Sequence, residues 1–226
     1  MTVYLRPGAP PRFPDAARAD EDGLVAIGGD LASERLLAAY DAGIFPWYDA
    51  GLPPMWWSPD PRTVIAPEGL HVSRSLARTI RRGRFRLTWD LEFGGVIREC
   101  ARGREQGTWL IPEMIAAYEK LHALGHAHSV EAWDGERLAG GLYGVHRGGL
   151  FAAESMFHRV TDASKVALVA AVRSLFRAGI EVFDVQMMTP HLARLGAEDW
   201  PRRRYLRRVT EVRRKRVDLD GLDVTP

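Results

Sequence analysis

The stretch Val182-Phe183-Asp184-Val185-Gln186-Met187 decides how the rest of the chain is interpreted. In a β-strand alternate side chains share a face, so Asp184 and Gln186 point the same way while apolar residues occupy both faces. Burying a carboxylate costs free energy unless another group pairs with it or uses it. The pattern predicts either a central strand with a functional carboxylate and amide, or an edge strand whose Asp and Gln meet water.

The composition is that of an ordinary globular protein. Of the 226 residues, 46% are hydrophobic and 27% are charged, and the formal net charge of +2 by itself points to no partner. This length suffices for one full domain and a smaller one. The single cysteine excludes a disulfide within the chain. The sequence has no apolar run long enough to cross a bilayer and no signal peptide, so we expect a cytoplasmic protein.

The N-terminal quarter is expected to form a unit of its own. The proline-rich residues 1–22 predict an irregular or extended lead-in. A short apolar run then stops at two glycines, and a helix follows that Ser33 can cap and Gly43 closes. We place a domain boundary near residue 62, which gives a small N-terminal α/β domain over residues 1–62.

Residues 63–226 predict an α+β domain with a mostly antiparallel sheet. Asp134-Gly135 is a strong hairpin signal between two alternating apolar runs. The expected elements are helices over 73–82, 93–102 and 112–124, strands over 85–89, 127–133, 136–145 and 149–157, a helix capped by Asp162 or Ser164 and running to Arg177, the strand at 183–187, and a basic helix from Pro201.

Four arginines recur at helical spacing along the helix expected over 73–82: Arg74, Arg78, Arg81 and Arg82. No acidic residue is interspersed among them, so their guanidinium groups repel one another unless an anion lies across them. The pattern favours phosphate binding, and the alternative is a solvated helix face.

Aromatic residues gather among prolines between residues 44 and 62, where Trp47, Trp56 and Trp57 lie close together in the sequence. Aromatic side chains held by prolines form rigid surfaces that stack on bases or enclose an apolar ligand. The other interpretation is a joint between domains that the tryptophans fasten, and both can hold.

Several common chemistries lack their sequence pattern. A metal site at His122, His126 and His128 is disfavoured because Gly125 interrupts their helix and no carboxylate or thiolate stands beside them. Ser155 lacks the elbow of serine hydrolases. An acetyl-CoA-dependent transferase needs a glycine-rich pyrophosphate loop, and the candidates at 104–109 and 137–142 both end in a bulky residue.

Glu154, Asp184 and Gln186 remain, and all three are expected on neighbouring core strands. The helix between them supplies an apolar wall that includes Leu168, Ala171 and Leu175. We therefore expect a cleft that is polar at one end and apolar at the other.

The chain resembles the leucyl/phenylalanyl-tRNA–protein transferase family, which appends Leu or Phe to proteins that begin with Arg or Lys. The motifs span nearly the whole chain in order, and together they are highly specific. They are Gly28-Gly29-Asp30-Leu31, Gly43-Ile44-Phe45-Pro46-Trp47, Trp56-Trp57-Ser58-Pro59-Asp60-Pro61-Arg62, Glu105-Gln106-Gly107-Thr108-Trp109, Leu124-Gly125-His126-Ala127-His128-Ser129, Gly140-Gly141-Leu142-Tyr143-Gly144-Val145, Glu154-Ser155-Met156-Phe157, Asp184-Val185-Gln186, Leu195-Gly196 and Pro201-Arg202-Arg203.

The resemblance implies a small N-terminal domain followed by an acetyltransferase-like (GNAT) domain. It also implies that the α-amino group of an acceptor protein attacks the ester at the tRNA 3′ end, with no cofactor and no metal. In the family, the residues that match Asp184 and Gln186 are assigned to activating the amine. A neutral amide is a very weak base, so we expect Gln186 to aim the amine and Asp184 to orient the amide.

The resemblance assigns further residues to binding. Glu154 is expected to hold the terminal ribose or the acceptor's N-terminus, Trp47 and Trp109 to stack on the 3′ adenosine, and the four arginines to contact the acceptor stem. The expected substrate pocket consists of Trp47, Trp109, Tyr118, Leu142, Phe151, Leu168 and Leu175. Ala171 and Leu175 stand where relatives have bulkier aromatics, which leaves the preference between Leu and Phe open.

Two alternatives to this function stay open: a CoA-dependent N-acetyltransferase and a tRNA-binding module without catalysis. On the main interpretation the partners are Leu-tRNA or Phe-tRNA, less Met-tRNA, and proteins with N-terminal Arg or Lys that are thereby marked for N-end-rule degradation. We expect a monomer in the cytoplasm.

Overall fold

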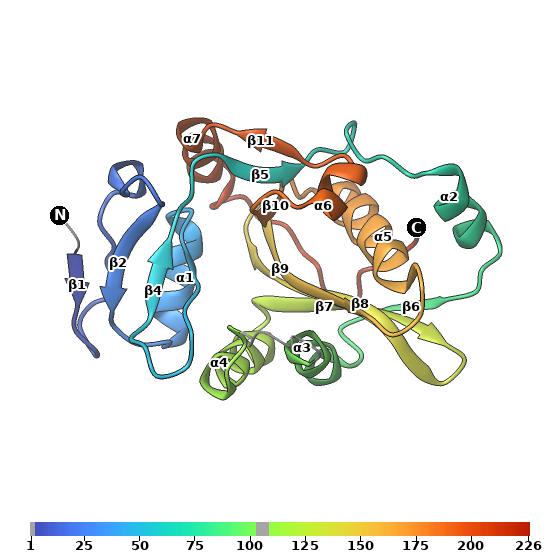
Figure 1. Cartoon of the computed structure of the whole chain (residues 1–226), viewed down its shortest axis with the longest axis horizontal. Coiled ribbons are helices and arrows are strands. Elements are labelled where there is room, and N and C mark those ends of the chain that lie inside the picture. Colours follow the sequence, from blue (N-terminus) through green and yellow to red (C-terminus); the bar gives the residue numbers. More distant parts are fainter. Residues whose placement is uncertain (1–2, 103–108) are drawn as a thin grey trace.

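The computed structural model describes residues 3–102 and 109–226, and it contains two β-sheets flanked by helices (Figure 1). The smaller sheet has the strand order β1-β2-β4-β3, and the larger has the order β11-β5-β10-β9-β8-β7-β6. The prediction of an α+β fold with a small N-terminal unit and a larger, mostly antiparallel sheet is confirmed.

The N-terminal sheet consists of β1 (Val3–Leu5), β2 (Leu24–Gly28), β3 (Phe45–Pro46) and β4 (Met55–Trp57). A short 3-10 helix η1 (Ala16–Arg18) precedes β2, and helix α1 (Ser33–Asp41) follows β2. β1 pairs in parallel with β2, so the lead-in contains a short strand that the sequence did not predict. The predicted Ser33 cap is wrong, because Ala32 occupies the N-cap position and no side chain caps the helix.

The larger sheet contains the predicted antiparallel meander: β7 (Ala127–Asp134), β8 (Arg137–Arg147) and β9 (Leu150–His158). β6 (Arg86–Trp89) extends it on one side. On the other side β10 (Val182–Gln186) pairs in parallel with β9 and antiparallel with β5 (Arg62–Ile65), and β11 (Glu198–Trp200) completes the sheet. The Asp184 strand is therefore central, with a neighbour on each side.

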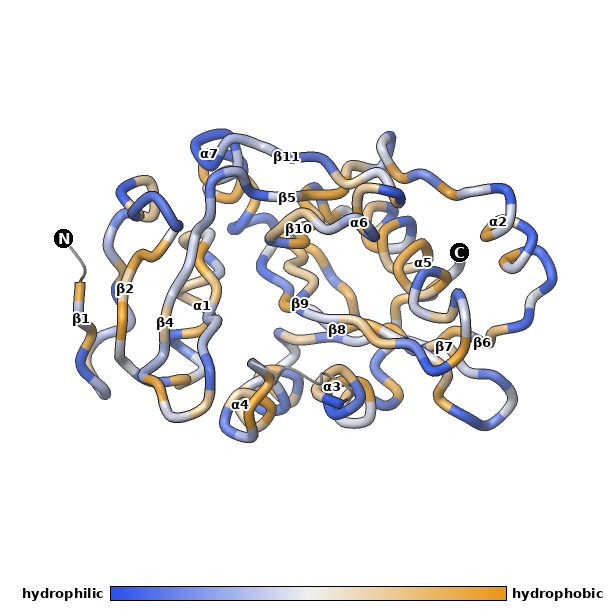
Figure 2. Tube along the Cα trace, viewed as in Figure 1, coloured by the Kyte–Doolittle hydropathy of each residue, from blue (hydrophilic) through white to orange (hydrophobic). Residues whose placement is uncertain are grey.

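Helices cover both faces of the larger sheet (Figure 1). α3 (Phe93–Ala101) and α4 (Pro112–Ala123) pack on one face, and α5 (Ala163–Ala178) packs on the other. α2 (Arg74–Arg81) contacts α5, while α6 (Pro190–Arg194) and α7 (Arg202–Val212) follow β10 and β11. In Figure 2 hydrophobic residues concentrate in α5 and the central strands, and hydrophilic residues dominate α7 and the outer turns.

The start of α5 differs from the prediction. Asp162 stands at the N-cap position, but its backbone is left-handed and its side chain caps no backbone N–H. The carboxylate instead accepts the Lys165 ammonium at 2.8 Å and the Thr79 hydroxyl of α2 at 3.4 Å. Asp162 therefore fastens α2 to α5 rather than capping the helix. Among the helices of the described residues, none is long and apolar enough to cross a membrane.

Candidate active site

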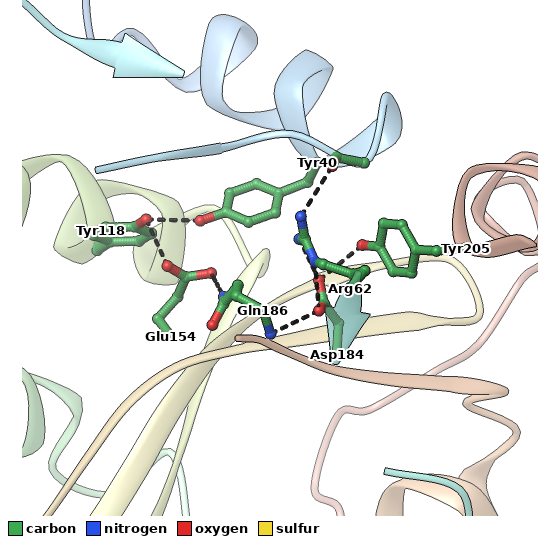
Figure 3. Close-up of polar contacts among 8 residues, drawn as sticks. Tyr40, Arg62, Tyr118, Glu154, Asp184, Gln186 and Tyr205 are labelled. Carbon is green, nitrogen blue, oxygen red and sulfur yellow. Dashed lines mark hydrogen bonds and ion pairs between the residues drawn. The ribbon is translucent and has the colours of Figure 1, made fainter. Parts of the chain in front are cut away.

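Asp184 lies at the centre of a buried ion pair (Figure 3). The Arg62 guanidinium donates to both of its oxygens, from Nε to Oδ1 at 2.8 Å and from Nη2 to Oδ2 at 2.6 Å. The Tyr205 hydroxyl donates to Oδ2 at 2.7 Å. Bidentate guanidinium–carboxylate pairing with an added hydroxyl satisfies a carboxylate that is fully buried. The Asp184 charge is thus neutralised by Arg62 on β5, and the Tyr205 hydroxyl on α7 adds a hydrogen bond.

Arg62 also ties the N-terminal unit to strand β10. Its Nη1 donates to the Gly43 carbonyl at 3.2 Å, and its guanidinium lies over the Phe45 and Tyr205 rings at 4.7 and 4.6 Å. Burial alone lowers the pKa of Arg62, but the adjacent Asp184 carboxylate outweighs burial and raises it. Arg62 is a permanent cation, and it joins β3, β5 and β10 at one point.

Gln186 has an unusual backbone conformation that the site itself holds in place. Its φ angle is +59°, a left-handed value that is uncommon for residues other than glycine. The backbone N–H of Gln186 donates to Asp184 Oδ1 at 2.9 Å, and the pairing of β10 with β5 shifts register between these two residues. The expectation that both side chains share one strand face therefore gives way to a bulge that sends them in different directions (Figure 3).

The Gln186 side chain reaches Glu154 on the neighbouring strand β9. Its Nε2 donates to Glu154 Oε1 at 2.8 Å, and the Tyr118 hydroxyl donates to Oε2 at 3.1 Å. Tyr118 in turn shares a 2.6 Å hydrogen bond with Tyr40 of α1. Burial raises the pKa of Glu154 to about 8, and the nearby Asp184 charge adds to the rise. At neutral pH Glu154 is therefore protonated more often than ionised.

A pocket of about 280 Å³ opens beside Gln186 and Glu154. Its walls are mostly apolar, which suits a hydrophobic side chain. The lining residues are Phe45, Pro46, Trp47, Trp109, Leu142, Ala153, Glu154, Ser155, Met156, Leu168, Val185, Gln186, Met187, Thr189 and Leu192. Trp47 and Met187 remain exposed at the rim, so the cleft has the polar end and the apolar end that were expected.

The structure brings some of the expected site residues to this pocket and places others elsewhere. Glu154, Gln186, Trp47, Trp109, Leu142 and Leu168 line it. Tyr118 lies behind Glu154, as its hydrogen bond partner. Phe151 stacks on Phe183 in the core, and Leu175 is buried in the same core cluster. Asp184 lies beneath Gln186 rather than in the pocket wall.

Arg74, Arg78 and Arg81 of the expected phosphate site lie on α2, and Arg82 is the C-cap residue of that helix. None of the four lines the pocket. Arg74, Arg78, Arg81 and Arg82 are all exposed. None of them forms an ion pair or a hydrogen bond through its side chain within residues 3–102 and 109–226. The buried Leu76 of the same helix packs against the core, which turns the arginines outward.

The chemistries that the sequence disfavoured gain no support. Within the described parts of the chain no group of His, Cys, Asp and Glu has the arrangement of a metal site. His128 instead bonds Asp90 at 2.6 Å, and His122 bonds the Ala127 carbonyl at 2.8 Å. Residues 137–142 belong to strand β8, whereas a pyrophosphate loop opens a helix. Residues 104–108 of the other candidate loop lie outside the described residues.

Arg62, Tyr205 and Tyr40 belong to this polar network, and the sequence did not indicate that they do. Arg62 ends a proline-rich motif and Tyr205 lies among arginines, so neither pattern indicated a contact with Asp184. The apolar strand around Asp184 did indicate that a partner exists, because a carboxylate buried there requires a cation from elsewhere in the chain. The sequence could not identify which arginine supplies it.

Comparisons with known proteins agree on one family. A family model described as leucyl/phenylalanyl-tRNA protein transferase matches residues 64–210, and the model of its N-terminal domain matches residues 29–60. A leucyl/phenylalanyl-tRNA–protein transferase of Anaeromyxobacter sp. is 55% identical over 231 residues, which cover 99% of this chain and 98% of that protein. Proteins of the same name from Nitratidesulfovibrio vulgaris and Myxococcus xanthus are 54% and 52% identical, and each alignment covers 91% of this chain and 89% and 90% of the relative.

Proposed function

The chain belongs to the leucyl/phenylalanyl-tRNA protein transferase family, and from that premise we propose how its site transfers Leu or Phe from aminoacyl-tRNA to a protein. The α-amino nitrogen of the acceptor attacks the ester carbonyl at the tRNA 3′ end. An amide bond forms, the ester C–O bond breaks, and the ribose oxygen leaves with a proton from the amine. Exchange of an ester for an amide runs downhill, so the step needs no nucleotide.

The orientation of the Gln186 amide carries this proposal. Its Nε2 is committed to Glu154, so its Oε1 is left as the acceptor on the pocket side. A carbonyl oxygen in that position accepts an N–H of the incoming amine and aims the nitrogen lone pair at the ester. Gln186 positions the nucleophile and does not act as a strong base, because an amide oxygen is a very weak base.

Asp184 supports this geometry from below. Three donors from Arg62 and Tyr205 and one from the Gln186 backbone occupy its oxygens. Both carboxylate oxygens are therefore engaged within the protein. Asp184 therefore acts on the reaction by holding the left-handed backbone of Gln186.

The donor occupies the pocket with its amino acid side chain against the apolar wall. Leu142, Met156 and Leu168 form that wall, and the methyl or phenyl groups of Leu and Phe fit its chemistry. Trp47 and Trp109 at the entrance stack on the 3′ adenosine. The exposed arginines of α2 contact the acceptor stem through its phosphates.

The remaining assignments rest on the family. Residues 1–62 form the N-terminal domain and residues 63–226 an acetyltransferase-like (GNAT) domain, in line with the mixed sheet and its helices on both faces. The acceptors carry N-terminal Arg or Lys, Met is a poorer donor amino acid, and the modified proteins enter N-end-rule degradation. The enzyme acts as a monomer in the cytoplasm.

The test is transfer of labelled leucine from Leu-tRNA to a peptide that begins with Arg, beside one that begins with Ala, without added nucleotide or metal. We expect label on the Arg peptide alone. Gln186→Ala is expected to reduce kcat at least about 100-fold while tRNA affinity stays unchanged. No transfer to either peptide would contradict the proposed function. Full activity of Gln186→Ala would contradict the positioning role proposed for the Gln186 amide.

A further inference from the structure

Four basic side chains on β9, α5 and α6 form a cluster around His191: His158, Lys165, His191 and Arg194, here called the α5–α6 patch. His158 and Arg194 are exposed, and Lys165 and His191 are half-buried. The pKa of His191 is lowered by burial and then by the charges of Lys165, His158 and Arg194, which is consistent with a single cluster.

Each element of the patch also supplies a pocket-lining residue. On β9, His158 follows the pocket residue Met156 by two positions, which places both on the same strand face. On α5, Lys165 precedes the pocket residue Leu168 by three positions, so both lie on one helix face. α6 carries the pocket residue Leu192 between His191 and Arg194. The patch therefore continues the pocket wall outward from three sides.

The outer side of the patch leads to α2. Asp162, three residues before Lys165, accepts both the Lys165 ammonium and the hydroxyl of Thr79 on α2. Thr79 lies next to Arg78 in that helix. The order in space is thus pocket, patch, Asp162–Thr79 contact and arginine face, and Figure 1 shows α6, α5 and α2 in the same order.

The net positive charge of the α5–α6 patch indicates which kind of molecule binds there. Asp162 is the one carboxylate that pairs with any patch residue among the described residues, so positive charge remains in excess. An acceptor protein with N-terminal Arg or Lys is repelled by such a surface, whereas nucleic acid phosphates are attracted. A single-stranded segment also crosses such an uneven surface more easily than a duplex does.

We propose that the α5–α6 patch binds the phosphates of the single-stranded tRNA 3′ end between the aminoacyl nucleotide in the pocket and the acceptor stem on α2. The inference rests on the proposed function for the identity of the RNA. On this proposal Lys165 and Arg194 help to bind the donor, aminoacyl-tRNA. The acceptor protein then approaches from the side of the pocket away from α6.

The test compares Lys165→Gln/Arg194→Gln with Asp162→Asn and with the control Arg203→Ala/Arg207→Ala. The control removes two exposed arginines from α7, which lies away from α2 (Figure 1) and contributes no residue to the pocket lining. Asn is tolerated at the left-handed backbone of Asp162, so this variant keeps the fold while removing the negative charge. The readouts are affinity for full-length tRNA at several salt concentrations, and transfer from Leu-tRNA and from 3′-O-leucyl-adenosine, which has no phosphate.

We expect Lys165→Gln/Arg194→Gln to weaken tRNA binding about tenfold and to reduce the salt slope by about 1.4, the value for two phosphates of a single strand. Asp162→Asn should tighten binding about twofold. Transfer from leucyl-adenosine should stay unchanged in both variants. Three results would each overturn the proposal. They are a larger loss of tRNA affinity in the control than in Lys165→Gln/Arg194→Gln, an unchanged salt slope in Lys165→Gln/Arg194→Gln, and an equal loss of transfer from leucyl-adenosine in that variant. Failure of the proposed function would appear separately, as absence of transfer by the unmodified protein from either donor.

Discussion

Asp184 Oδ1 accepts the backbone N–H of Gln186, two residues further along β10, at 2.9 Å. The same carboxylate receives a bidentate guanidinium from Arg62, which also holds the Gly43 carbonyl. The position of the Gln186 backbone is therefore fixed by a chain of contacts that begins in the N-terminal unit. Separating Asp184 from Arg62 should affect both stability and catalysis.

Asp184→Asn should destabilise the protein by about 3–5 kcal/mol, because it leaves the buried Arg62 cation without its counter-charge. It should also lower kcat, because the NH2 group that replaces one carboxylate oxygen meets the donors of Arg62 or Tyr205 and disturbs the contact that holds the Gln186 backbone. Asp41→Asn is the control, because Asp41 pairs with Arg147 in a half-buried site and its loss should cost about 1 kcal/mol or less. Urea unfolding and transfer assays measure both effects. Equal unfolding midpoints for the two variants would contradict the role given to the buried pair.

Glu154 should make stability depend on pH in a defined window. Its pKa is about 8 in the folded protein against an ordinary value of 4.5, so between these values the folded state binds more protons than the unfolded state. The stability contributed by Glu154 is thus fully present below pH 4.5 and is lost as pH rises through 8.

Glu154→Gln removes this titration. The unfolding midpoint of the variant should therefore fall less between pH 5 and pH 9 than the midpoint of the unmodified protein. The difference between the two proteins is the informative quantity, because the pKa of Glu131 is also raised by burial and titrates in both. Parallel pH curves would show that Glu154 ionises normally.

Arg78→Ala/Arg82→Ala should weaken tRNA binding and reduce its salt slope by about 2, because each lost phosphate contact with a duplex accounts for about 0.9. Arg84→Ala/Arg86→Ala is the matched control. Arg84 already pairs with Asp134, and Arg86 lies over the Trp133 ring, so these nearby cations are engaged within the protein. Filter binding across a salt series measures both doubles. The control losing as much slope as the α2 double would assign the effect to net charge alone.

The sequence predicted the elements whose signals are local. The meander of β7 to β9 followed from alternating apolar residues and the Asp134-Gly135 turn, and α2, α3, α4, α5 and α7 followed from their periodicity. β5 and β11 were missed because they are short and their pairing partners lie far away in the sequence. β1 was missed for the same reason, among prolines that favour irregular structure.

The site was predictable as a set of residue types and less so as a geometry. A carboxylate and an amide in an apolar strand indicated function, but strict alternation placed Asp184 and Gln186 side by side. The register shift after Asp184 coincides with the left-handed Gln186 backbone and with its hydrogen bond to Asp184 Oδ1. Strand periodicity carries no information on such a bulge.

Leu168 and Leu175 are both buried in the same core cluster of α5, and of the two Leu168 alone also lines the pocket. Leu168→Ala removes part of the apolar wall and so enlarges the pocket. We expect the ratio of kcat/KM for Phe-tRNA over Leu-tRNA to rise about tenfold. Leu175→Ala should lower the free energy of unfolding by about 2–5 kcal/mol and leave that ratio unchanged. Competition between the two charged tRNAs in one reaction measures the ratio independently of enzyme stability. A ratio that moves with Leu175→Ala and not with Leu168→Ala would place the side-chain pocket deeper along α5.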